Sequence, residues 1–170
     1  RANTVDIYPT LLEIAGVTIE KQPVLDGKSL IPLIDGRITA RSKPMGFWDY
    51  PEKGIGVPSD AMMAEVLEAQ RAGHEPEDRE KLWLDADKIT KQYSQTELPG
   101  HAAWIDGDWK LHRIADASGQ KVRFELYNLA DDRAEGTDLY SAQPDRSERM
   151  KAALESWQRS VVGSLNGNDY

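Results

Sequence analysis

Apolar and polar residues alternate along two neighbouring runs in the second half of the chain, His101–Ile105 and Asp108–Ile114. A period of two is typical of half-buried strands. The dipeptide Asp106-Gly107 stands between the runs, and Asp-Gly favours a two-residue type I′ hairpin turn. The pattern therefore predicts a β-hairpin over 101–114.

Two further runs complete the predicted sheet. Apolar Val122, Phe124 and Leu126 fall on one face of a third strand, with polar or aromatic residues between them. An aromatic run lies between Pro44 and Pro51, and it predicts an edge strand because proline cannot donate to a ladder hydrogen bond. We expect a small antiparallel sheet of about four strands.

The last element is a helix that opens at Pro144-Asp145 and ends at Asn166-Gly167. Its apolar positions recur at i, i+4, i+7 and i+11, which gives one stripe along the helix. The stripe consists of Met150, Leu154, Trp157 and Val161. We expect it to cover one face of the sheet and the neighbouring Gln158 to be exposed.

A short helix is predicted near the start of the chain, with Asp6 as N-cap, Pro9 in the first turn and Gly16 just past its end. It is apolar on more than one face. Those side chains are Ile7, Tyr8, Leu11, Leu12 and Ile14. We expect them to need an additional partner surface, so that without one residues 4–36 would associate with a second copy or be displaced.

Residues 51–99 separate the edge strand from the hairpin, and we interpret them as an insertion. A helix is predicted after a Ser59 or Asp60 cap, with Gly73 as its stop. The charged residues 74–98 fit either a second, weaker helix or an extended arm. The predicted fold class is therefore α+β: the sheet, the C-terminal helix packed on it, and an inserted helical arm.

Composition excludes several classes of function. The chain of 170 residues has a net charge of −8 and no basic stripe, which argues against a nucleic-acid partner. No apolar run approaches the roughly 20 residues that span a bilayer, so no membrane partner is expected. The absence of cysteine excludes disulfides, thiolate zinc sites and a cysteine nucleophile. The chain begins at Arg1 without a signal peptide, and we expect it to be a fragment of a longer protein.

Three segments of the second half carry a family resemblance. Gly107–Leu111 reads G-D-W-K-L, Glu125–Leu129 reads E-L-Y-N-L, and Asp132–Leu139 contains D-x-x-E-x-x-D-L. In this order they resemble the C-terminal signature of sulfatases, in the arylsulfatase family of the alkaline phosphatase superfamily. Two positions depart from the family pattern: Arg133 replaces the usual Pro, and Asp138 replaces the usual Asn.

Earlier landmarks of the same family occur in the expected order. Asp6–Gly16 resembles the helix that closes the sulfatase α/β domain, Leu25–Ile34 resembles an L-D-G-x-S-L-x-P-L-L run, and 43–50 resembles an F-W-E-H segment. The resemblance implies that 1–36 are trailing helices and linker of a missing α/β catalytic domain. It implies that 37–170 form the C-terminal subdomain and that the N-terminal sulfatase domain is their partner. A homo-oligomer through the exposed N-terminal helix is the other partner expected.

The resemblance also implies a chemistry for the parent protein. Sulfatases hydrolyse sulfate esters with a formylglycine, made from Cys or Ser in a C/S-x-P-x-R motif, and with a calcium ion. This chain has no Cys, and no Ser is followed by x-P-x-R. We therefore expect calcium and formylglycine in the full-length parent and no catalytic centre here. A periplasmic or extracellular location is suggested by the resemblance alone.

Two other functions remain open. One is a hydrolase of the same superfamily that acts on phosphate or phosphonate esters, which the missing nucleophile motif would distinguish. The other is a non-catalytic module that binds carbohydrate or protein by itself.

Three residues are candidates for facing a substrate. His101 begins the hairpin where family members bring substrate-contacting residues to the rim of the active site, although a plain strand residue also fits. Trp48 and Asp49 pair a ring with a carboxylate, which suits sugar binding, although aromatic strand residues more often lie in a core. His74 and His112 are expected to be a solvated and an ordinary strand residue. The acidic run 131–138 is expected to be a structural turn rather than a calcium loop, because it lacks the final Glu of that loop.

Overall fold

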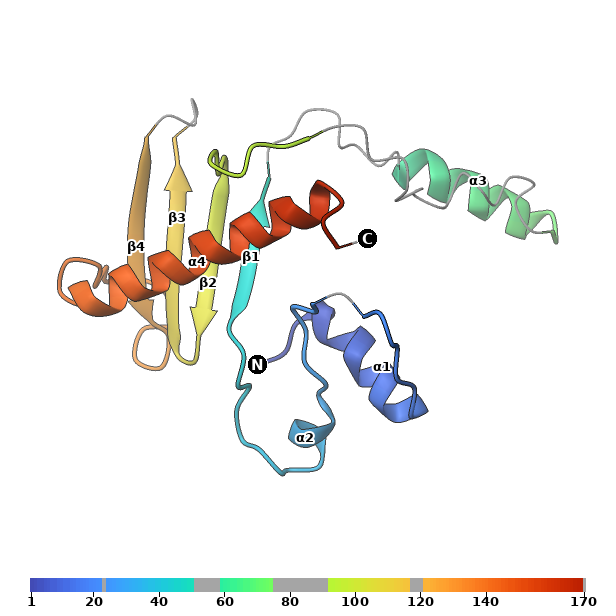
Figure 1. Ribbon diagram of the computed structural model, residues 1–170, viewed down its shortest axis with the longest axis horizontal. Helices are drawn as coiled ribbons and strands as arrows, with labels where there is room; N and C mark the ends of the chain where they lie inside the picture. Colours follow the sequence, from blue (N-terminus) through green and yellow to red (C-terminus); the bar gives the residue numbers. More distant parts are fainter. Residues whose placement is uncertain (23, 51–58, 75–91, 117–120, 170) are drawn as a thin grey trace.

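The computed structural model of the chain describes residues 1–22, 24–50, 59–74, 92–116 and 121–169 (Figure 1). Its centre is a four-stranded antiparallel sheet in the order β1-β2-β3-β4. The strands are β1 (Met45–Asp49), β2 (His101–Asp106), β3 (Trp109–Ala115) and β4 (Val122–Asn128). The predicted α+β class is confirmed, and β1 is an edge strand as expected.

The hairpin between β2 and β3 differs from the prediction in its turn. Asp106 pairs with Trp109 as the last residue of β2, so the two turn residues are Gly107 and Asp108. The backbone φ is positive at Gly107 (57°) and not at Asp108. That pattern is typical of a type II′ turn rather than the predicted type I′.

One long helix, α4 (Pro144–Leu165), crosses one face of the sheet (Figure 1). Its predicted bounds are confirmed, with Asn166 as C-cap. The core between helix and sheet holds side chains with at most 5% of their surface exposed. They are Ala102, Leu111, Leu126, Met150 and Leu154. Burial of these apolar side chains is the main stabilising contribution of the domain.

The second half of α4 departs from the predicted stripe. Gln158 and Val162 are fully buried, whereas Val161 is only half-buried, so the expectation that Gln158 is exposed was wrong. Beyond the sheet the helix meets the segment before β2. Asn166 accepts a hydrogen bond from the backbone N–H of Tyr93 at 2.7 Å. A contact with so distant a segment cannot be read from the helical period.

The N-terminal part consists of a 3-10 turn η1 (Thr4–Asp6), α1 (Ile7–Ala15) and a short α2 (Ile31–Ile34). Gly16 ends α1 with a φ of 65°, as predicted for that position. Figure 1 shows α1 beside the sheet, outside the layer formed by the sheet and α4. Thr10 is the one residue of α1 that is buried.

The insertion contains α3 (Ser59–Arg71), and Gly73 follows it with a φ of 79°. The helix predicted there is confirmed, and it projects away from the sheet (Figure 1). Most of the second predicted element, residues 75–91, lies outside the described residues. None of the helices described has the length and apolar character needed to cross a membrane.

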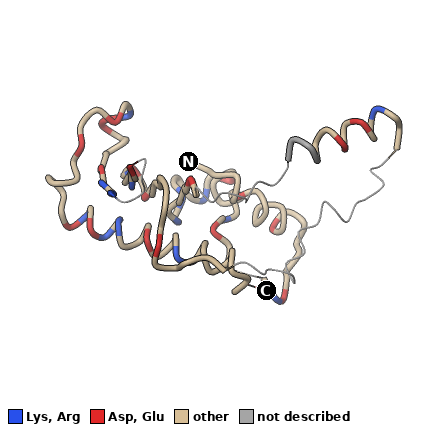
Figure 2. Tube along the Cα trace, turned by 90° about the horizontal axis from the view of Figure 1, so that it is seen from above, with Lys and Arg blue, Asp and Glu red and all other residues tan. Residues whose placement is uncertain are grey.

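Charged residues are mixed along the chain. Figure 2 shows Lys and Arg interspersed with Asp and Glu along α4, where Arg159 pairs with Glu155 at 3.4 Å. Within the described residues no basic stripe appears, which agrees with the expectation drawn from composition.

Candidate functional site

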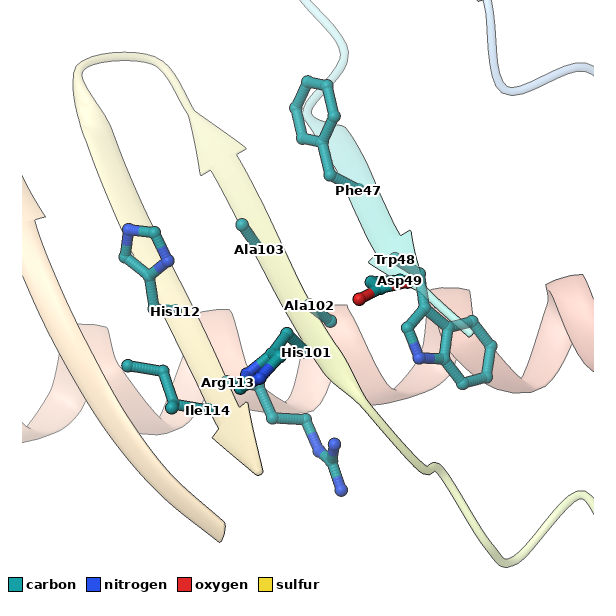
Figure 3. Close-up of a pocket in the computed structure, with 9 residues that line it drawn as sticks. All are labelled: Phe47, Trp48, Asp49, His101, Ala102, Ala103, His112, Arg113 and Ile114. Atoms are coloured by element: carbon teal, nitrogen blue, oxygen red, sulfur yellow. The ribbon is translucent and has the colours of Figure 1, made fainter. Parts of the chain in front are cut away.

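The face of the sheet opposite α4 carries alternate residues of three strands. Phe47 and Asp49 come from β1, and their neighbours in the register, Ala103 and His101, come from β2. Together with β3 they surround an open depression with a volume of about 720 Å³. Figure 3 shows the side chains that line it. Because successive residues of a strand point to opposite faces, this face is separate from the core under α4.

Asp49 and His101 face each other directly across β1 and β2. Directly opposed residues have Cβ atoms about 4.5–5.5 Å apart, close enough to hold one ligand group between them. Both residues are exposed. Within the described residues neither side chain has a hydrogen-bond or ion-pair partner. The pair is therefore available for a polar ligand.

Trp48 lies differently from its neighbour. Its indole Nε1 donates a hydrogen bond to the carbonyl oxygen of Pro99 at 2.7 Å, and its ring lies 6.5 Å from the ring of Trp157 on α4. The ring therefore belongs to the core side, although Trp48 borders the depression. The aromatic ring on the open face is that of Phe47, which is 44% exposed. The period of two, applied to Trp48 and Asp49, already placed these side chains on opposite faces.

Of the other histidines, His112 is bound rather than an ordinary strand residue. Its Nε2 lies 2.7 Å from Oε2 of Glu135, and the second oxygen of Glu135 lies 2.6 Å from Nζ of Lys110. Burial alone would raise the pKa of Glu135, but the hydrogen bonds from Lys110 and His112 lower it. The carboxylate therefore fastens the loop after β4 onto the open face. His74 is exposed, as predicted.

Glu135 adopts an unusual backbone conformation to make these contacts. Its φ is 57°, and it is the one non-glycine residue of the described chain in the left-handed region. Such a conformation costs about 1 kcal/mol or more for a residue with a Cβ. The two charge-assisted hydrogen bonds offset that cost.

Arg113 anchors the start of β2 from the core side. It is only 8% exposed, and its Nη1 donates a hydrogen bond to the carbonyl oxygen of Gly100 at 2.6 Å. Burial lowers the pKa of the guanidinium. Gly100 directly precedes His101, so Arg113 helps to fix the position of that histidine.

The motifs that resemble sulfatases mostly make structural contacts. Asp6 is fully buried, and its carboxylate accepts hydrogen bonds from Arg41 at 2.6 Å and from the backbone N–H groups of Lys28 and Asn3 at 2.8 and 2.9 Å. Burial alone would raise the pKa of Asp6, but these hydrogen bonds lower it to about 2. Asp6 therefore stays ionised and joins three segments of the chain.

The L-D-G-K-S run is held by two further contacts. The hydroxyl of Thr10 accepts a hydrogen bond from the backbone N–H of Leu30 at 2.9 Å. A Cβ at Gly27 would lie 1.9 Å from the carbonyl oxygen of Val5, so only glycine allows this close approach. The run serves to pack the N-terminal part rather than to bind phosphate.

The acidic run 131–138 is a structural turn, as predicted. Asp132 accepts a hydrogen bond from the backbone N–H of Thr137 at 2.8 Å, and backbone N–H groups, that of Gly136 first, lower the pKa of Asp132. Asp138 accepts from the backbone N–H groups of Leu126 and Tyr140 at 2.9 and 2.8 Å. A carboxylate oxygen accepts these bonds as the amide oxygen of Asn would, which explains why Asp is compatible with this position.

A calcium site does not fit the residues described. No cluster of three or more His, Asp or Glu side chains suited to a metal ion occurs among them. We therefore assign no step of a reaction to a metal held by this part of the chain.

Comparison with known proteins found two similar solved structures. The structure of BT4656 in complex with its substrate D-glucosamine-2-N,6-O-disulfate matches over 91% of this chain and 24% of its own, with 16% identity and a TM-score of 0.47. The phosphonate monoester hydrolase of Agrobacterium radiobacter matches over 97% of this chain and 25% of its own, with 18% identity and a TM-score of 0.38. The chain thus spans about a quarter of the length of these structures. No family model and no curated protein matches the sequence. BT4656 is a sulfatase, and both structural neighbours are members of the alkaline phosphatase superfamily, the superfamily that the sequence motifs resemble.

Proposed function

We propose that this chain is the C-terminal part of a sulfate-ester hydrolase of the arylsulfatase family, and that its first 36 residues dock onto the catalytic α/β domain of that protein. In this proposal the chain completes the fold of the enzyme and shapes the rim of its active site. The nucleophile and the calcium ligands belong to the catalytic domain. Hydrolysis therefore requires both parts.

One observation carries the docking proposal: the apolar stripe of α1 faces outward. Ile7, Leu11 and Ile14 recur at i, i+4 and i+7 and are 53%, 58% and 64% exposed. The opposite side of the helix is occupied by the contacts of Asp6 and Thr10 with the 27–30 loop. A contiguous apolar surface of this kind is typical of an interface.

The rest of the N-terminal part extends this apolar surface. Further large apolar side chains there are at least 39% exposed: Val5, Val17, Ile19, Val24, Ile34 and Ile38. Residues 1–41 contain five basic and five acidic side chains, so the segment has no net charge within a chain of net charge −8. An apolar, electrically neutral surface suits a permanent contact with another domain.

Point variants test this surface better than deletion of residues 1–36. Asp6 and Asp26 connect the segment to Arg41 and Trp157, so a deletion would also damage the core. We expect the chain alone to self-associate in light scattering and the double variant Leu11→Lys, Ile14→Lys to be monomeric. The matched control is Val122→Lys, at a 37% exposed valine of β4. A wild-type chain that is monomeric and binds no apolar dye would contradict the docking proposal.

The reaction itself is tested with the coding sequence that precedes this chain. A C-x-P-x-R or S-x-P-x-R motif there, and calcium-dependent hydrolysis of an aryl sulfate by the longer protein, would support a sulfatase. A different nucleophile motif, with activity on phosphate or phosphonate esters, would favour the alternative hydrolase. We expect the 170-residue chain alone to hydrolyse neither class of ester.

A further inference from the structure

We propose that the open face of the sheet binds a carbohydrate ring, with Phe47 as the stacking surface and the opposed pair Asp49 and His101 as the hydrogen-bonding groups. The site is built only from β1, β2 and β3 of this chain. The proposal therefore goes beyond the docking and ester hydrolysis proposed above and stands or falls separately from them.

The shape and composition of the depression support this choice of ligand. Its volume of about 720 Å³ falls in the range of small-molecule sites, about 300–1,000 Å³. Ala103, with its small side chain, lies beside Phe47 in the register and leaves the ring of Phe47 accessible at its edge. A flat, partly apolar floor of this kind suits the C–H face of a sugar ring rather than an extended peptide.

The polar groups match the other requirement of a sugar. A carbohydrate presents neighbouring hydroxyl groups that both donate and accept hydrogen bonds. The carboxylate of Asp49 accepts only, whereas the imidazole of His101 can donate through one ring nitrogen and accept through the other. Two adjacent hydroxyl groups can therefore satisfy both side chains at once. The exposed pair has no competing partner within the described residues, so binding requires no bond to be broken.

Other ligand classes fit this face less well. A metal ion would need a third ligand near Asp49 and His101, and His112 is occupied by Glu135. An anionic ligand would meet the carboxylate of Asp49 at the centre of the site. A purely apolar ligand would leave the Asp49–His101 pair unused.

The proposal is tested by NMR titration of the 170-residue chain with methyl β-glucoside, and with cyclohexanol as a ring that lacks neighbouring hydroxyl groups. We expect saturable shifts of the His101 ring and of β1 and β2 amides, with a Kd on the order of 1–10 mM. Phe47→Ala and Asp49→Asn should each weaken binding by about fivefold to tenfold. Val122→Ala on β4 is the matched control and should leave the Kd unchanged.

Two outcomes would overturn the proposal. The first is the absence of saturable shifts up to about 100 mM glucoside, a concentration that detects even very weak binding. The second is equal binding of cyclohexanol and glucoside with no effect of Asp49→Asn, which would show an apolar contact only. The dispersion of amide signals in each variant shows that the sheet remains folded. Either outcome leaves the docking of α1 and the reaction of the longer protein untouched.

Discussion

The indole Nε1 of Trp157 donates a hydrogen bond to Oδ2 of Asp26 at 3.1 Å, across 131 positions of the sequence. The same indole packs on the backbone of β1, because a Cβ at Gly46 would lie 2.5 Å from its ring atoms. Trp157 thus connects α4, the edge strand and the N-terminal part. Three of the segments that resemble sulfatases meet at this one side chain.

Removal of that side chain should destabilise the whole chain. We expect Trp157→Ala to lower the free energy of unfolding by about 3 kcal/mol, at the lower end for large aromatic residues because the ring is only half-buried. Chemical denaturation monitored by far-UV circular dichroism measures the change. Ser156→Ala, at the exposed neighbouring position, is the control. Equal midpoints for the two variants would show that Trp157 is not a structural centre.

Gly46→Ala tests the same contact from the strand side. The added methyl group would overlap the Trp157 ring, so the ring or the strand has to move. Overpacking of this kind costs about 1–3 kcal/mol. Alanine should in contrast be tolerated at Gly136, where the nearest atom lies 3.8 Å from the added Cβ. A melting temperature unchanged by Gly46→Ala would contradict the observed packing.

The ionised Asp6 should make stability depend on acid pH. Its pKa is about 2 in the folded chain against an ordinary value of 3.8, so the folded state favours the ionised form. The resulting stabilisation, about 2 kcal/mol, is complete above about pH 5 and is lost as the pH falls towards 2.

Asp6→Asn should remove most of this pH dependence and destabilise the chain at pH 7, because Arg41 then lacks its buried anionic partner. Denaturation midpoints at several pH values measure both effects. Glu68→Gln, at an exposed position of α3, controls for the loss of one acidic group. A variant that keeps the full wild-type pH dependence between pH 5 and 2 would refute the role of Asp6.

Gln158 offers a prediction in the opposite direction. Its side chain is fully buried, and neither its amide nitrogen nor its amide oxygen has a hydrogen-bond partner. A buried polar group without a partner costs about 1–3 kcal/mol. We therefore expect Gln158→Met, which has a similar volume, to raise the free energy of unfolding by about 1 kcal/mol. A loss of stability would indicate that the amide is satisfied by a buried water molecule.

Glu135 should be sensitive in spite of its position in a loop. Glu135→Gln keeps the size of the side chain and removes the charge that binds Lys110 and His112. We expect a loss of about 1–2 kcal/mol, since hydrogen bonds to charged groups contribute roughly that much. The loss should disappear as the pH falls below 4, because Glu135 itself is then protonated. Hydrogen exchange of the 129–139 amides gives an independent measurement.

The sequence by itself determined the order and type of the described elements. Period-two alternation placed the sheet strands, and Pro144, Gly16 and Gly73 marked helix ends correctly. These signals succeed because each depends on the backbone preferences of a few adjacent residues. The order of the sulfatase-like motifs could likewise be read from the sequence.

Only the tertiary structure decided which faces are covered. Gln158 is buried because the end of α4 meets the segment that contains Tyr93, and His112 is bound because a loop after β4 returns over it. The strand pattern predicted that Trp48 and Asp49 point apart, but not that α4 would claim the tryptophan and leave the carboxylate beside His101. Contacts between residues far apart in sequence depend on how whole elements pack, and local periodicity contains no information about that.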